Sequence, residues 1–176
     1  MSIDIGADAI DREYASNNAV YKQCYIEGHP AAVSGKIIKV RLWIKGHIGY
    51  PLQIGTLYKT NGNVFSSRDW GRVHAPVDGY NEYTRWYLNG WAPLELDCEA
   101  GDYIGVRMWQ APTGNGIAVD TGVGLGRWRT LSENVSFPFT NKEFNFLADQ
   151  EMSLNGEMAP AIILPTVTTD PATEIT

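Results

Sequence analysis

Residues 38–45, Ile-Lys-Val-Arg-Leu-Trp-Ile-Lys, alternate with a period of two between an apolar set and a set of cationic or amphipathic side chains. Successive side chains of a β-strand point to opposite faces of its sheet, so this pattern predicts a strand with one buried and one solvated face. The buried set would be Ile38, Val40, Leu42 and Ile44. The stretch therefore favours a fold built from half-buried strands.

A hairpin follows this strand. Residues 52–60 and 64–70 both read as strands, and Asn61-Gly62 lies between them. Asn-Gly readily supplies the two positive φ angles of a type I′ turn, which joins antiparallel neighbours. We therefore expect two adjacent antiparallel strands here.

Further strands are expected in segments that turn signals such as His29-Pro30 and Gly101-Asp102 separate. No segment keeps the apolar spacing of an amphipathic helix over three turns. The sequence therefore predicts an all-β fold, an antiparallel β-sandwich of jelly-roll type that spans residues 1–158. The other expected strands are 21–27, 80–88, 94–98, 103–109, 117–120, 144–154 and 161–164.

Residues 110–134 form a glycine-rich segment in which only Ile117–Asp120 has strand character. Long loops in compact domains are often functional. We expect this loop to contact a partner through Arg127, Trp128 and Arg129, which follow the glycines of residues 122–126. The alternative is a plain hairpin with flexible glycines.

Residues 159–176 are rich in Thr and Pro and contain no basic residue, so they cannot build a core of their own. A terminal segment of this kind becomes ordered when it docks on a surface. We expect an extended C-terminal arm that buries apolar side chains against a neighbouring subunit. These side chains are Ile162, Ile163, Leu164 and Val167.

Composition and charge narrow the class of protein. The chain of 176 residues has 18 Gly, 9 Tyr and 6 Trp but only 19% charged residues, which is typical of a turn-rich β protein. Its net charge of −6 without a basic cluster disfavours nucleic-acid binding. No apolar run approaches a membrane span and no signal peptide begins the chain, so we expect a protein that is soluble and not secreted. Residues 143–176 contain six acidic residues and no basic residue. This negative charge would favour either contacts with other subunits or the solubility of the protein.

The usual signatures of metal, cofactor and nucleophile chemistry are absent from the sequence. His29, His47 and His74 lie far apart, and Cys24 and Cys98 are expected to be reduced packing residues. We therefore predict no metal, no cofactor and no enzymatic activity. Asp97, Glu99 and Asp102 leave three interpretations open, which are a solvated turn, a calcium site and a glycosidase acid pair.

Aromatic residues crowd residues 70–91, with several arginines among them. Flat rings beside hydrogen-bonding groups can form a sugar-binding platform. The candidate platform residues are Trp70, Tyr83, Trp86 and Trp91. Alternation along a strand would instead place about half of the rings in a core or a subunit interface.

Two short motifs carry a family resemblance: Ile3-Asp4-Ile5-Gly6 followed by Ala9-Ile10-Asp11-Arg12, and Glu99-Ala100-Gly101-Asp102-Tyr103-Ile104-Gly105-Val106. With residues 34–43 and 54–58, they resemble an uncharacterised jelly-roll-like β-sandwich module of tailed-phage structural proteins. The likeness spans about residues 3–110 and implies no catalytic residues.

The resemblance implies a non-enzymatic virion protein that assembles in the host cytoplasm. Such a protein would decorate the capsid or join tail or fibre parts, bind major capsid or tail subunits, and form a homo-oligomer. The alternative that the aromatic residues leave open is a carbohydrate- or receptor-binding module with a glycan as its ligand.

Overall fold

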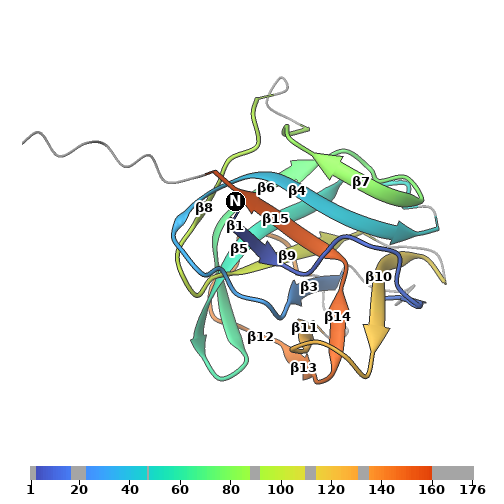
Figure 1. Cartoon of the computed structure of the whole chain (residues 1–176). Helices are drawn as coiled ribbons and strands as arrows, with labels where there is room; N and C mark the ends of the chain where they lie inside the picture. The colour runs from blue at the N-terminus through green and yellow to red at the C-terminus, as the bar shows by residue number, and fades with distance from the viewer. Residues whose placement is uncertain are drawn as a thin grey trace, which may run out of the picture.

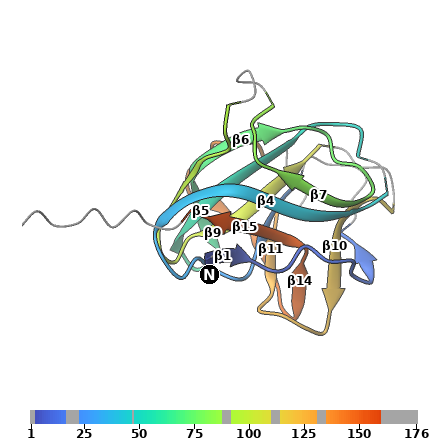
Figure 2. The same ribbon diagram turned by 45° about the horizontal axis from the view of Figure 1, so that its top comes forward.

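The structure is a computed structural model that describes residues 3–16, 23–46, 48–87, 92–109, 114–130 and 135–159. Two antiparallel sheets pack face to face, and no helix occurs in the described residues (Figures 1 and 2). The predicted all-β sandwich is confirmed. The jelly-roll connectivity stays a prediction.

The first sheet has eight strands and is centred on the long strand β4 (Gly35–Lys45), which pairs with four others. Its path runs β1-β15-β4-β10-β14, with β2 on β10 and with β7 and β8 on β4. The other strands are β1 (Ile3–Gly6), β2 (Tyr14–Ala15), β7 (Gly79–Tyr83), β8 (Leu96–Cys98), β10 (Gly116–Thr121), β14 (Gln150–Met152) and β15 (Leu154–Met158).

The second sheet has seven strands in the order β12-β6-β5-β9-β3-β11-β13. These are β3 (Gln23–Glu27), β5 (Leu52–Asn61), β6 (Val64–Val73), β9 (Tyr103–Met108), β11 (Arg127–Arg129), β12 (Lys142–Glu143) and β13 (Asn145–Leu147).

The inter-sheet core is made by the inward side chains of both sheets. On β4, Val40, Leu42 and Ile44 are buried as the alternation predicts, but Ile38 is exposed and Ile37 is buried instead. The pairing of β4 with β15 skips Ile38, because Glu157 lies opposite Lys39 and Met158 lies opposite Ile37. This bulge shifts the alternation by one residue, which a strict period of two does not reveal.

A second apolar cluster, which we call the outer core, covers the other face of the seven-stranded sheet. Its centre is Phe65, which makes edge contacts with Tyr103, Trp128 and Phe144. Residues 135–139 cross this face and are tied to β6, because the Phe139 N–H donates to the Ser67 hydroxyl. The sandwich is therefore covered on one outer side, where Val135 and Phe137 are buried.

The glycine-rich segment differs from the predicted long loop, because it contains two strands, β10 and β11. They are joined by a turn in which Gly122, Gly124 and Gly126 all take positive φ. A Cβ on Gly126 would lie 2.4 Å from the Phe146 ring. The glycines thus make a tight turn possible rather than a flexible loop.

The predicted strand 144–154 is likewise wrong in extent. It is divided into β13, β14 and the start of β15, and Asp149 takes φ +52° in the turn that joins β13 to β14. Asp tolerates this left-handed conformation better than most residues. The strand predicted at 161–164 lies outside the described residues, as does the arm beyond Ala159.

The predicted hairpin is confirmed by the pairing of β5 with β6, but its turn is shifted by one residue. Asn61 belongs to β5, and the turn residues are Gly62 and Asn63, of which only Gly62 has a positive φ. Glycine at the first turn position is typical of a type II′ turn rather than of type I′.

Cys24 and Cys98 are both buried and are not bonded to each other. Burial raises the pKa of the Cys98 thiol to about 12 and also raises that of Cys24. Within the described ranges, no helix has the length and apolar character of a membrane span.

Candidate functional site

A row of polar side chains crosses the outer face of the seven-stranded sheet. On β5, Leu52 and Ile54 point into the inter-sheet core, so Gln53 points outward. Gln53 lies opposite Arg72 of β6 on one side and opposite Arg107 of β9 on the other. The strand register therefore places one guanidinium group on each side of the Gln53 side-chain amide.

This row forms one wall of a pocket of about 230 Å³, which we call the Gln53 pocket. The remaining walls are rings from two separate segments: Tyr50 and Pro51 precede β5, and Trp109 follows β9. Among the described residues, those that line the pocket are Tyr50, Pro51, Gln53, Arg72, Arg107 and Trp109. The rings of Tyr50 and Trp109 remain partly exposed, so they can contact a ligand.

Gln53 is the most unusual residue of the pocket. Its side chain is only 3% exposed, and its Oε1 has no hydrogen-bond partner in the described part of the chain. A buried acceptor without a partner costs about 1–3 kcal/mol of folding free energy. Buried polar groups without a hydrogen-bond partner are rare in folded proteins.

Arg107 is held in place on two sides. Its Nε donates to the Val135 carbonyl at 2.9 Å, and its guanidinium carbon lies 4.4 Å from the centre of the Trp109 ring. Arg107 is 4% exposed, and burial lowers its pKa, as does the positive charge of Arg72 to a smaller degree. A guanidinium keeps its proton in spite of such a shift.

Neither arginine of the pocket has a carboxylate partner among the described residues. Arg72 is exposed and forms no ion pair or hydrogen bond with the described residues, in contrast to Arg12, Arg41 and Arg68, which all bind carboxylates. The Gln53 pocket thus combines partly exposed ring faces with the exposed Arg72, while Gln53 and Arg107 are almost completely buried. This combination suits a polar ligand with flat apolar faces.

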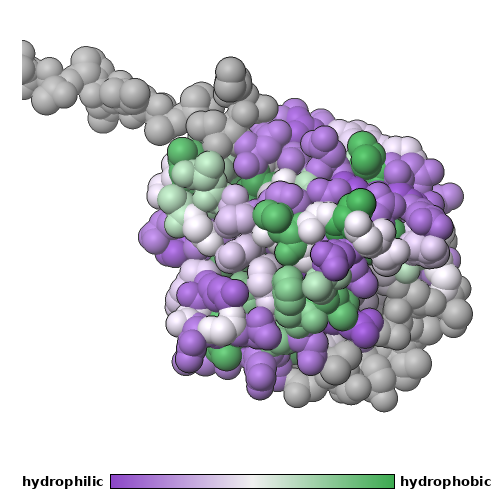
Figure 3. All heavy atoms as spheres, turned by 60° about the horizontal axis from the view of Figure 1, so that its bottom comes forward, coloured by the Kyte–Doolittle hydropathy of each residue, from purple (hydrophilic) through white to green (hydrophobic). Residues whose placement is uncertain are grey.

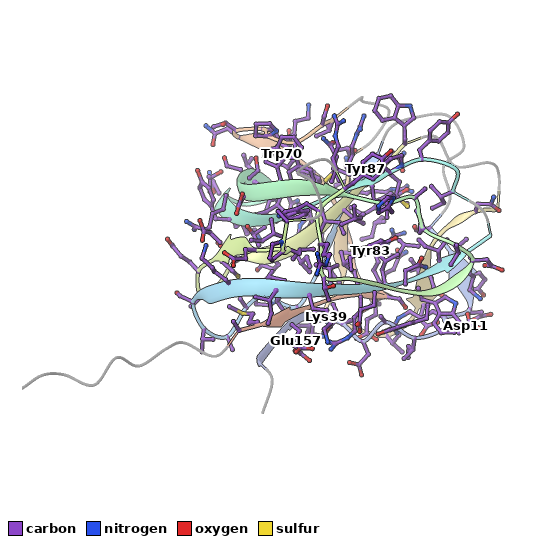
Figure 4. The ribbon with its side chains drawn as sticks, turned by 90° about the horizontal axis from the view of Figure 1, so that it is seen from above. Asp11, Lys39, Trp70, Tyr83, Tyr87 and Glu157 are labelled. Atoms are coloured by element: carbon purple, nitrogen blue, oxygen red, sulfur yellow. The ribbon has the colours of Figure 1, made fainter. Side chains whose placement is uncertain are left out.

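The residues predicted as a sugar platform do not lie together. Trp70 lies on the outer core and stacks on Phe137 with 6.4 Å between ring centres. Tyr83 and Trp86 pack instead against the inter-sheet core, and burial raises the pKa of Tyr83. Figure 4 shows Trp70 and Tyr83 at different levels of the sandwich. Trp91 lies outside the described residues.

The residues predicted to bind a partner in the glycine-rich segment are used largely within the fold. Trp128 is buried in the outer core and its Nε1 donates to Asn63. Arg127 is buried over the Tyr25 ring and donates to Gln150, and burial lowers its pKa to about 10. Arg129 is half-buried on the same strand. A partner role for these three residues stays a prediction.

The four predicted contact residues of the arm lie outside the described residues. They are Ile162, Ile163, Leu164 and Val167.

The acidic residues of the turn before β9 have structural partners. Asp102 is 2% exposed and binds the Arg68 guanidinium through both carboxylate oxygens. The same guanidinium binds Glu99, while Asp97 pairs with Lys36. No group of three metal-ligating side chains occurs within the described ranges. This arrangement favours a structural turn over a calcium site or an acid pair.

The strands that carry Gln53 and Arg107 were predicted, but the predicted strand 64–70 ends before Arg72. None of the pocket residues Tyr50, Gln53, Arg72, Arg107 and Trp109 was identified as part of a site. Comparisons with protein-family models, with curated proteins and with solved structures find no match to this chain.

Proposed function

We propose that the protein is a non-enzymatic β-sandwich module that binds a carbohydrate in the Gln53 pocket. The observation that carries this proposal is the pocket itself, which the partly exposed Tyr50 and Trp109 rings line together with the exposed Arg72. A sugar hydroxyl can accept a hydrogen bond from the exposed Arg72 guanidinium. The C–H faces of a sugar ring can pack on the aromatic rings at a low entropic cost to the protein.

The volume of the pocket supports a small ligand. At about 230 Å³ it is smaller than the roughly 300–1,000 Å³ that is typical of pockets for drug-sized molecules. We therefore expect one sugar residue, or the end of a longer glycan, to enter it. The Tyr50 and Trp109 rings would stack on the sugar, and the exposed Arg72 would donate hydrogen bonds to its oxygens.

Replacing Tyr50 with Ala should weaken glycan binding by about 0.5–1.5 kcal/mol, which is roughly a two- to tenfold loss of affinity. Titration calorimetry of the full chain with sugars found to bind in a glycan screen measures this. The matched control is Tyr80→Ala, because Tyr80 is 47% exposed on β7 and Tyr50 is 52% exposed. Equal losses in both variants, or no binding of any glycan by the wild type, would contradict the proposal.

As a second candidate we propose a non-enzymatic phage virion component that contacts neighbouring subunits, as the family resemblance implies. The observation that favours it is a group of exposed apolar side chains, Val123 and Leu125 in the β10–β11 turn and Phe146 on β13. Contact of Gly126 with Phe146 brings the turn and the strand together. On the face that Figure 3 turns forward, a small apolar patch lies among mostly hydrophilic side chains. Burial of such a side chain at an interface is worth about 1.5–3 kcal/mol.

This second candidate predicts a homo-oligomer that Leu125→Ser weakens. Light scattering on the full chain should give a mass above 19.5 kDa for the wild type and a lower mass for the variant. Val77→Ser is the matched control, because Val77 is 64% exposed and Leu125 is 61% exposed. A wild-type chain that remains monomeric at its highest soluble concentration would contradict self-assembly through this surface.

A further inference from the structure

We infer that the Gln53 pocket receives the C-terminal arm of a second copy of this chain, with Pro171 packed against the Tyr50 and Trp109 rings and Asp170 bound to Arg72. The inference goes beyond the proposed function, because it assigns the pocket a protein occupant that a sugar would have to displace.

The first argument is the chemistry of the pocket surface. Gln53 and Arg107 are almost completely buried, so an occupant meets mainly the partly exposed rings of Tyr50 and Trp109. The exposed Arg72 adds a cation beside these rings. Surfaces lined by aromatic rings are the usual binding sites of proline-containing segments, because proline has a fixed φ and loses little conformational entropy on binding.

The second argument is the sequence of the arm. Residues 160–176 contain three prolines and two acidic residues but no basic residue. Pro171 is the only one of these prolines with an acidic neighbour, since Asp170 precedes it. A residue before proline favours an extended conformation, so this dipeptide presents an apolar ring and a carboxylate on one short stretch of chain.

The third argument is the match of charge and size. Among the described residues, no acidic side chain lines the pocket. A carboxylate from Asp170 would compensate the exposed Arg72 guanidinium without the desolvation cost of a buried ion pair. The volume of about 230 Å³ is below the range of pockets for drug-sized molecules, so it suits one small ring such as that of Pro171.

The fourth argument concerns the place where the arm begins. The N–H of Ala159, the last described residue, donates to the Lys36 carbonyl, so the arm begins beside the first residues of β4. Tyr50 follows the last residue of β4, so the pocket lies toward the opposite end of this strand. In Figure 1, β15 ends on the left and β4 ends on the right.

These positions favour an arm from a second copy. The 11 residues of β4 span about 33 Å, at about 3.3 Å per residue. The 12 residues from Ala159 to Pro171 reach at most about 43 Å. Within one chain, the arm would also have to pass from the eight-stranded sheet around to the outer face of the seven-stranded sheet, which leaves almost no spare length. A second copy can present its arm without this constraint.

The first test is sedimentation analysis of the full chain over a range of concentrations at low ionic strength. The wild type should self-associate, and Pro171→Ala should weaken the association roughly tenfold, because the variant loses about two buried methylene groups. The matched control is Pro165→Ala, which makes the same change in the same arm at a proline without an acidic neighbour. This control should keep most of the affinity.

A charge exchange tests the pairing of Asp170 with Arg72. Arg72→Glu and Asp170→Arg should each weaken self-association roughly three- to tenfold, because each replaces an attraction by a repulsion between exposed charges. An equal mixture of the two variants should associate more tightly than either variant alone. In the mixture, the arm of the Asp170→Arg variant meets the pocket of the Arg72→Glu variant, and only contact between different copies gives this recovery.

Three outcomes would overturn the inference. The first is a wild-type chain that stays monomeric at its highest soluble concentration. The second is an equal loss of association in Pro165→Ala and Pro171→Ala, or a mixture that associates no better than the single charge variants. The third is association that Leu125→Ser abolishes and Pro171→Ala leaves unchanged, which would assign the contact to the β10–β11 turn. Sugar binding is measured separately, so none of these outcomes decides the carbohydrate proposal.

Discussion

Replacing Phe65 with Ala should lower the free energy of unfolding by about 3–5 kcal/mol, which is the usual range for removing a fully buried Phe. Phe65 is completely buried, and its ring contacts Tyr103, Trp128 and Phe144 at centre distances of 5.1–5.6 Å. The change would leave a cavity at the centre of the outer core. Urea or guanidinium unfolding of the full chain measures the effect.

The matched control for Phe65 is Phe146→Ala. Phe146 also packs on Trp128, with 5.0 Å between ring centres, but it is largely exposed at the edge of the sheet. We expect this change to cost about 1 kcal/mol or less. If Phe65→Ala were as mild as Phe146→Ala, the outer core would not be an integral part of the fold.

Asp102→Ala is expected to destabilise the protein by about 3 kcal/mol, because it breaks a buried ion pair and leaves its partners unsatisfied. The Asp102 carboxylate accepts hydrogen bonds from the Arg68 guanidinium and, at 2.8 Å, from the Glu99 N–H. We place the effect at the lower end of the range for such pairs because Arg68 reaches solvent in part. Chemical denaturation again provides the measurement.

Asp97→Ala is the control for the same turn. Asp97 pairs with Lys36 on the surface, and both side chains are at least half exposed. Such a pair contributes about 0–1 kcal/mol. Equal losses for Asp97→Ala and Asp102→Ala would contradict the structural role of Asp102, since the two acids would then be equivalent surface charges.

The sequence was most informative where periodicity reflects burial alone. Val40, Leu42 and Ile44 of β4 face the inter-sheet core as predicted. The alternation of apolar residues could not locate the bulge at Ile38. Ile37 and Ile38 are both apolar, so the sequence pattern does not show which of them points into the core. Nor could it find the turn at Asp149, since a non-glycine residue with positive φ leaves little compositional signal.

The glycine-rich segment was misread for a related reason. Several glycines within a few residues suggested a long loop, but their positive φ angles produce one tight turn between β10 and β11. The contacts that require glycine there come from β13 and β14, which follow later in the chain. Composition alone therefore could not show whether the glycines allow close contact between neighbouring strands or make the segment flexible.

The candidate site was beyond sequence reasoning because it depends on register. Gln53, Arg72 and Arg107 come from three different strands, and a slip of one residue in either pairing would turn one of them to the opposite face. The aromatic residues of 70–91 were conspicuous by their density, yet Trp86 packs against Gly71 and the inter-sheet core. The rings that line the pocket, Tyr50 and Trp109, lie outside that dense segment.

The most direct measurement for the Gln53 pocket is NMR chemical-shift mapping of the full chain during titration with the tightest-binding sugar. We predict that the largest changes occur at the Trp109 indole N–H and the Gln53 side-chain amide, with smaller changes at Arg72. Changes centred on the Val123–Leu125 turn instead, or no changes at the pocket when the ligand saturates the protein, would contradict the assignment of this pocket as the binding site.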